Sequence, residues 1–227
     1  MTSAILHLIL ALLSLVGGLV IRTVWAKRRI KEQYIKRLSS FFFLFTFCHL
    51  SFGLPYLIYP DNLRVLAWGY NFAIAFMFLS VIFIWKMVFE ILCFSAQKIR
   101  SMTIFFLFLA LITVLVQIFN MRLPTIFHNG FIIWNGNLIS GIIISLYIIF
   151  LVILWIYILL KNWPKEITFI EKLKSVLITI GAILMGSSFI YYIAYNYTMV
   201  LLSFIFVFLG TTIFIIPFLI PKKREIQ

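Results

Sequence analysis

Charged residues are scarce in this chain, and acidic residues are the scarcest of them. Only 11% of the 227 residues are charged, and six Asp and Glu stand against nineteen Lys and Arg. A soluble domain is typically about 25% charged and about 45–50% apolar. Here 64% of the residues are hydrophobic and the mean hydropathy is +1.15. This composition excludes an ordinary soluble domain and predicts an integral membrane protein of the cell membrane.

The long apolar runs contain no Asp, Glu, Lys or Arg at depth. Proton pumps, ion-coupled carriers and voltage sensors place such charges inside the membrane, although each one costs free energy there. Their absence disfavours these classes. The run at 199–220 also lacks lysine, which excludes a retinal Schiff base at the position where microbial rhodopsins carry it.

Residues with catalytic or metal-binding potential are few. The two cysteines, Cys48 and Cys93, are too few for a disulfide framework. No paired acids and no nucleophile with a neighbouring base occur, so we expect no enzyme and no cofactor. The three histidines are His7, His49 and His128. We expect no metal site from all three, because a rise of about 1.5 Å per residue places His49 too deep to meet both of the others.

The positive charge of the chain indicates a membrane rather than a nucleic acid as its partner. A net charge of +13 could suit nucleic acid. The basic residues lie, however, at the ends of apolar runs, where they determine topology and contact anionic lipid headgroups. No separate basic domain exists, so we expect the lipid bilayer as a partner and no nucleic acid.

The basic segment at 22–37 fixes the expected orientation. It holds seven Lys and Arg and one acid, and a cluster of this kind stays on the cytoplasmic side. The predicted fold is an all-α, seven-transmembrane-helix bundle with its N-terminus outside and its C-terminus cytoplasmic. All but two of the nineteen Lys and Arg, Arg64 and Arg122, then lie inside. The predicted helices span about 4–21, 38–59, 63–85, 102–119, 138–160, 175–195 and 199–220, followed by a short basic tail at 221–227.

Two local patterns predict further features. Asn129-Gly130 lies between apolar residues, which is a hairpin signal. We therefore expect 125–127 to pair with 131–133 and to form a cap over the outer mouth of the bundle. In the sixth helix, Ala182 and Gly186 have the small-xxx-small spacing that lets helices approach closely.

Three polar residues inside the apolar runs are the candidate ligand-binding residues: His49, Asn71 and Gln117. With the aromatic residues of the outer half they could line an outward-opening pocket, among the second, third, fourth and sixth helices beneath the cap. The alternative is that these residues bond to neighbouring helices and that the aromatic residues form an ordinary belt at the membrane interface.

Several apolar motifs carry a resemblance to a known family. They are Trp68-Gly69-Tyr70 at the start of the third helix, the aromatic stretch at 76–83, and the segment 129–134 that leads into the fifth helix with Tyr147. Over residues 1–220 the chain resembles the N-terminal seven-helix sensor region of bacterial histidine kinases. In that family a kinase or cyclase domain usually follows the seventh helix, whereas seven residues follow here. The resemblance therefore implies either a stand-alone sensor or a truncated one, which must signal through a partner.

Three functional hypotheses follow from these patterns. The first is a receptor-like or sensor-like membrane protein that binds a small ligand in the outer half of the bundle and acts on a signalling partner. The alternative is a small-solute transporter or permease component, because an uncharged substrate would need no buried charge. An intramembrane enzyme ranks last, for want of catalytic groups.

Overall fold

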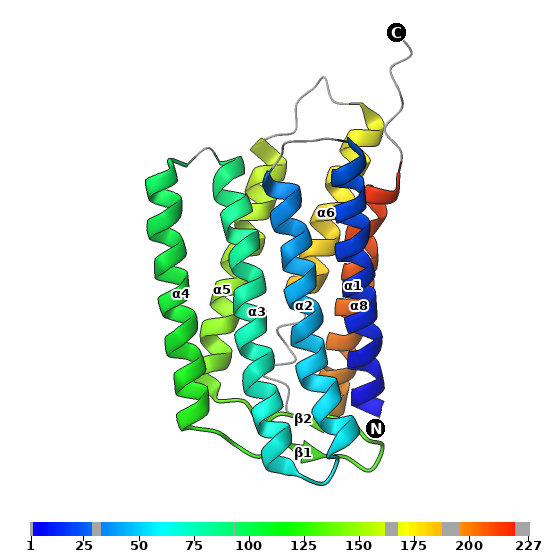
Figure 1. Cartoon of the computed structure of the whole chain (residues 1–227), viewed down its shortest axis with the longest axis vertical. Helices are drawn as coiled ribbons and strands as arrows, with labels where there is room; N and C mark the ends of the chain where they lie inside the picture. Colours follow the sequence, from blue (N-terminus) through cyan, green and yellow to red (C-terminus); the bar gives the residue numbers. More distant parts are fainter. Residues whose placement is uncertain (1, 29–32, 93, 162–167, 188–195, 221–227) are drawn as a thin grey trace.

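The computed structural model describes residues 2–28, 33–92, 94–161, 168–187 and 196–220. Within these ranges the chain forms long helices that run side by side, with one short hairpin at one end of the bundle (Figure 1). The helices are α1 (Thr2–Arg28), α2 (Gln33–Ile58), α3 (Leu63–Ile91), α4 (Ala96–Phe119), α5 (Leu138–Lys161), α6 (Phe169–Ser187) and α8 (Tyr197–Leu219), and the strands are β1 (Thr125–Ile126) and β2 (Ile132–Ile133).

The helices identify the chain as a helical membrane protein. Among the described residues, α1, α2, α3, α4, α5 and α8 are long and apolar enough to cross a membrane. Their outward faces carry large exposed apolar side chains, which suit contact with hydrocarbon rather than water. The shorter α6 begins with three charged residues, Glu171, Lys172 and Lys174, in its first two turns. The end at 195 predicted for this helix lies outside the described residues.

Several helices are longer than predicted at the basic end of the bundle. The first continues to Arg28 instead of 21, the second begins at Gln33 instead of 38, and the fourth begins at Ala96 instead of 102. An apolar run measures only the part of a helix that lies in hydrocarbon. Lys, Arg, Gln and Glu are good helix formers, so the helices continue into the polar segments on either side.

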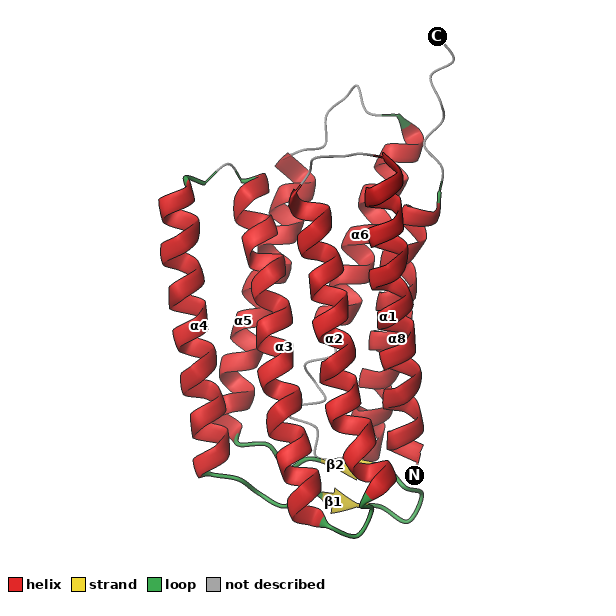
Figure 2. Ribbon diagram, viewed as in Figure 1, coloured by secondary structure: helices red, strands yellow, loops and turns green. Residues whose placement is uncertain are grey.

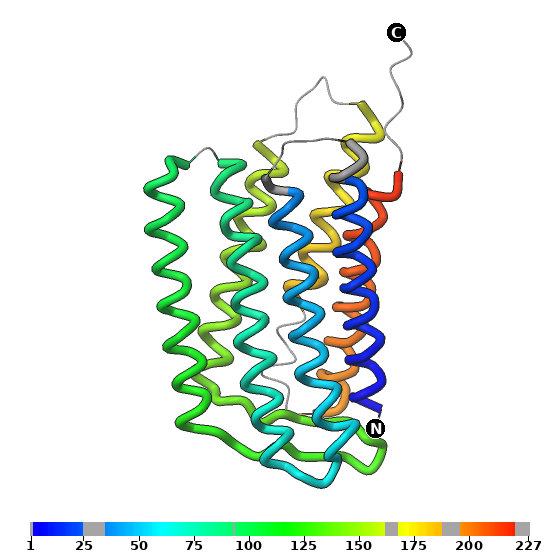
Figure 3. The backbone as a smooth tube through the Cα atoms, viewed as in Figure 1, coloured from blue at the N-terminus to red at the C-terminus, as the bar shows by residue number. Residues whose placement is uncertain are grey.

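Six of the helices close into a ring. α1 packs against α2 and α8, α2 against α3, α3 against α5, α5 against α6, and α6 against α8. α4 packs mainly on α3 and α5, and it lies at the edge of the bundle (Figures 2 and 3). The ring of α1, α2, α3, α5, α6 and α8 therefore encloses an interior from which α4 is excluded.

The hairpin pairs as the sequence predicts. Thr125 lies opposite Ile133 and Ile126 opposite Ile132 in an antiparallel pair. Gly130 has a φ of 77° at the turn, a backbone conformation that glycine adopts without a steric penalty. The strand β2 is buried, and β2 also contacts α8.

The first turn of α1 is bonded to this hairpin. The Ser3 amide donates to the Gly130 carbonyl (3.1 Å), and the Ile132 amide donates to the Ser3 hydroxyl (3.1 Å). The Thr2 hydroxyl donates to the Asn129 carbonyl (2.6 Å). The first amides of a helix have no partner within the helix itself, so the hairpin supplies one and is held in place by the same contacts.

The opposite end of the bundle is basic. Arg64 and Arg122 lie at the hairpin end, whereas the other described Lys and Arg residues lie at the far ends of the helices (Figure 1). There Arg37 of α2 forms a bidentate pair with Glu90 of α3. Its Nε donates to Oε2 (2.8 Å) and its Nη2 donates to Oε1. A two-bonded guanidinium–carboxylate pair fixes orientation as well as distance.

The helices α6 and α8 approach each other closely enough for backbone contact. A Cβ atom added to Gly181 would lie 2.7 Å from the Phe214 amide nitrogen and 2.8 Å from the Gly210 carbonyl oxygen. The spacing of Ala182 and Gly186 predicts close packing in this helix, but the pair in backbone contact is Gly181 with Gly210. Gly186 meets the Val152 side chain of α5 instead.

We predict that Gly181→Ala destabilises the protein by about 1–3 kcal/mol, the usual cost of overpacking, because the added methyl group meets backbone atoms that cannot move aside. Gly18→Ala is the matched control, since the nearest atoms to its Cβ would be side-chain atoms, in the Phe43 ring and the Phe42 Cβ, at 3.2–3.4 Å. Equilibrium unfolding in detergent measures both. Equal stability of the two variants would contradict the assigned contact.

Candidate functional site

Two histidines meet inside the bundle. His7 of α1 and His49 of α2 are 2% and 5% exposed, and their Nδ1 atoms are 3.2 Å apart. The expectation was that His49 lies too deep to meet both of the other histidines. It meets one of them, His7, because both residues lie in the half of the bundle nearest the hairpin. In the described part of the chain no group of three or more His, Cys, Asp or Glu residues could hold a metal ion.

The contact between the two rings has a defined chemistry. A neutral imidazole carries one N–H donor and one bare nitrogen acceptor. Two facing Nδ1 atoms can bond only if one ring holds its proton there and the other does not. The pair therefore has two arrangements, with the proton on His7 or on His49. In both arrangements the His49 Nε2 is left over, and it has no hydrogen-bond partner among the described residues.

Aromatic side chains surround the histidine pair. Phe52 stacks on His7 with ring centroids 4.6 Å apart, and Phe204 of α8 meets the same ring edge-on at 4.8 Å. Phe45 meets His49 edge-on at 4.6 Å. Trp134, which directly follows β2, packs on Phe52 at 5.2 Å. The hairpin is thus connected to the histidine pair through one aromatic contact.

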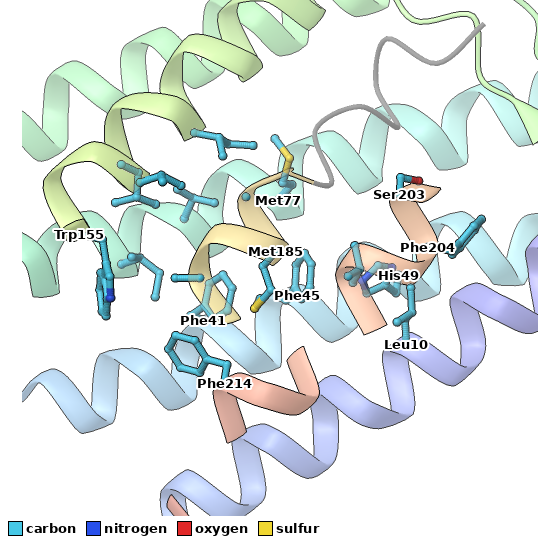
Figure 4. Close-up of a pocket in the computed structure, with 18 of the residues that line it drawn as sticks. Leu10, Phe41, Phe45, His49, Met77, Trp155, Met185, Ser203, Phe204 and Phe214 are labelled. Carbon is cyan, nitrogen blue, oxygen red and sulfur yellow. The ribbon is translucent and has the colours of Figure 1, made fainter. Parts of the chain in front are cut away.

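A cavity of about 110 Å³ lies within the helix ring, beside the histidines (Figure 4). Its described lining is apolar and aromatic, apart from the two imidazoles, the Ser203 hydroxyl and the Trp155 indole, and contains no Asp, Glu, Lys or Arg. The residues that line it are His7 and Leu10 of α1, Phe41, Phe45, His49 and Phe52 of α2, Met77, Val81 and Ile84 of α3, Ile148, Leu151, Val152 and Trp155 of α5, Ala182, Met185 and Gly186 of α6, and Ser203, Phe204, Val207 and Phe214 of α8.

The structure does not bring the three candidate residues together. His49 lines the cavity, but Asn71 and Gln117 do not. Gln117 belongs to α4, which contributes no described residue to the lining. Its Oε1 accepts the Asn137 amide (2.9 Å) just before α5 begins. Of the helices predicted to surround a ligand, the second, third and sixth contribute to the described lining of the cavity, and the fourth does not.

Asn71 is buried on α3 without a complete set of partners. Its Nδ2 donates a weak bond to the Met121 sulfur (3.4 Å), and its Oδ1 has no partner among the described residues. A sulfur atom is a poor acceptor, so the amide is held weakly. The Asn71 side chain does not line the cavity, and its hydrogen bond adds little to the stability of the protein.

Several cavity residues were not predicted, notably His7 and Ser203. A signal for His7 was present, because a histidine in hydrocarbon needs a partner on another helix. His7 follows the start of the first helix, and His49 precedes the end of the second. Antiparallel neighbours with polar residues at these positions can pair. The sequence gives no such indication for Ser203, because a serine hydroxyl can bond within its own helix. Here it donates to the Val200 carbonyl (2.8 Å).

We predict opposite outcomes for the two amides. Gln117→Leu leaves the backbone N–H of Asn137 without its partner. This should lower the stability by about 1–3 kcal/mol, the penalty of an unpaired buried group. Asn71→Leu removes an amide whose oxygen is already unpaired, so the stability should stay the same or rise. Unfolding of both variants in detergent, beside the wild type, tests this. A large loss for Asn71→Leu would show that its oxygen has a partner.

No family model, curated protein or solved structure matches this chain. Its function has to be argued from its own residues. The features that bear on function are the cavity inside the helix ring, the histidine pair on its wall and the hairpin that closes this end of the bundle.

Proposed function

We propose that the protein is a non-enzymatic, receptor-like membrane protein that binds a small uncharged ligand in the central cavity and signals through a partner. The observation that carries this proposal is the cavity within the helix ring, whose described lining contains no charged side chain. Small-molecule sites are concave and mostly apolar, with a few placed polar groups and frequent positions between the helices of a bundle. The cavity has each of these properties.

We further propose seven spans, with the hairpin end outside and the basic end in the cytoplasm. The distribution of Lys and Arg supports this orientation, because short cytoplasmic loops carry an excess of basic residues. The proposed ligand site then lies nearer the outer face, below the hairpin. The resemblance to the sensor region of histidine kinases points to the same orientation and to signalling at the cytoplasmic face.

Contacts between helices could carry a change at the cavity to the proposed cytoplasmic face. α2 and α3 both line the cavity, and the Arg37–Glu90 pair joins them at the basic end. A ligand can shift an equilibrium only by its difference in affinity for two arrangements. A ligand that contacts six helices at once meets this condition whenever those helices can pack in two ways.

A permease for an uncharged solute is the second candidate. Two cavity-lining helices contain an internal proline, Pro55 in α2 and Pro217 in α8. Proline removes one helical hydrogen bond and permits bending, which a carrier needs in order to open to either side. Uptake of a confirmed ligand into protein-containing vesicles, above the rate for empty vesicles, would favour this function over a receptor.

The ligand proposal predicts thermal stabilisation. In a panel of small uncharged compounds, at least one should raise the unfolding temperature of the purified full-length protein. At about 100 times Kd the gain is about 2.7 kcal/mol. Ala182→Leu extends a side chain into the cavity and should abolish the shift. Ala96→Leu, at the exposed start of α4, is the matched control and should keep it. A shift that persists in Ala182→Leu would place the ligand elsewhere.

The topology proposal predicts the location of both ends of the chain. A reporter that is active only in the cytoplasm should be active when fused after Gln227 and silent when fused before Met1. Replacing the seven Lys and Arg of 22–37 with Gln should give mixed orientations, because these charges dominate the inside bias. A silent but well-expressed fusion after Gln227 would contradict the seven-span arrangement.

A further inference from the structure

We propose that the ligand of the central cavity is a small uncharged phenol or aromatic alcohol, whose hydroxyl group pairs with His49 Nε2. This inference rests on the proposed function, since it names the chemical class that the same cavity would bind. It starts from a comparison of the polar atoms that the described residues bury without a partner. These atoms belong to Ser14, His49, Asn71, Trp85, Tyr147 and Thr211.

Among these six residues, His49 is the only one that lines the cavity. The other five residues do not belong to the described lining of the cavity. The His49 ring is also held in place, because its Nδ1 faces His7 at 3.2 Å and Phe45 packs against its side. The cavity wall therefore carries a fixed imidazole whose Nε2 is not satisfied by the described protein.

A hydroxyl group fits this position in either state of the histidine pair. If His49 donates its Nδ1 proton to His7, its Nε2 is a bare acceptor and a ligand hydroxyl donates to it. If His7 donates, His49 Nε2 carries the proton and the ligand hydroxyl accepts it. A hydroxyl is both donor and acceptor. A carbonyl or ether ligand would suit only one of the two arrangements.

The rest of the lining selects an aromatic body without charge. No Asp, Glu, Lys or Arg occurs among the described lining residues, so an ammonium or carboxylate ligand would be buried without a counter-charge. Phe41, Phe45, Phe52 and Phe214 present aromatic surfaces to the cavity, together with the sulfur-containing side chain of Met185. Such side chains favour aromatic partners. An engineered cavity of about 150 Å³ holds benzene, so a space of about 110 Å³ suits a ring of this size with few substituents.

Phenol and toluene are the probes that isolate the hydroxyl group. They have nearly the same shape, and both partition into detergent. His49 Nε2 is buried without a partner among the described residues. Phenol supplies a partner on binding, whereas toluene leaves this nitrogen unpaired. The purified full-length protein should therefore bind phenol about tenfold more tightly than toluene, the usual value of one buried hydrogen bond. Benzoate and benzylamine should not bind saturably.

Two variants assign the preference to His49. His49→Phe should retain saturable binding of toluene but bring the affinity ratio of phenol to toluene close to one. His128→Phe is the matched control, because His128 is exposed on the hairpin, and it should keep the tenfold preference. Ala182→Leu should abolish saturable binding of both probes. This variant distinguishes binding in the cavity from partitioning of the probes into detergent.

A measurement on the wild type covers the case in which His49→Phe fails to fold. The chain has three histidines, so the nitrogen resonances of imidazole-labelled protein can be assigned to each ring. Phenol should shift the His49 Nε2 resonance, and toluene should leave it unchanged. Toluene that binds as tightly as phenol, or a preference that survives His49→Phe, would overturn this inference and leave the proposed function standing. Absence of saturable binding for every uncharged probe would overturn both.

Discussion

The bilayer interior offers no hydrogen-bond partner, so each polar group at membrane depth has to be paired within the protein. Several of the buried hydroxyls meet this constraint locally. Thr46 donates to the Phe42 carbonyl (2.9 Å) and Thr113 to the Leu109 carbonyl (2.8 Å), each one turn earlier in its own helix. An imidazole cannot bond its own helix in this way. The two buried histidines therefore pair with each other, and that contact joins α1 to α2 beside the cavity.

The same constraint explains where irregular backbone occurs. A hairpin exposes amides and carbonyls that hydrocarbon cannot satisfy, so it is tolerated at the end of the bundle. There its strands pair with each other, and the first turn of α1 takes the Gly130 carbonyl and the Ile132 amide. In return, the hairpin buries Trp134 against Phe52, which stacks on His7. The element that closes the bundle is thus in packing contact with the wall of the cavity.

Features that depend on local patterns could be predicted from the sequence, and features that depend on helix faces could not. Apolar runs located six membrane-length helices, and Asn129-Gly130 located the hairpin with its register. The cavity required knowing that α1 closes on α8 and that α4 stays outside. Helices such as α4 and α5 are apolar on all sides, so no polar stripe marks the face that turns inward. The chemistry of His49 made it a candidate from the sequence. Its pairing with His7 could not be predicted in the same way, because it depends on how the helices close into the ring.

The packing around the ring is uneven, and this decides where a ligand could act. α6 and α8 meet through backbone atoms at Gly181 and Gly210, and α2 meets α3 where a Cβ on Gly69 would lie 2.6 Å from the Ser51 carbonyl. Contacts of this kind leave little freedom, because interiors are close-packed and backbone atoms do not adjust. α5 is different: only five of its residues are buried, yet four of its side chains, Ile148, Leu151, Val152 and Trp155, form one wall of the cavity. α6 has still fewer buried residues, Thr179 and Gly181, but its backbone contact with α8 holds it in place. The position of α5 therefore costs least to change, so occupancy of the cavity should be felt first by α5.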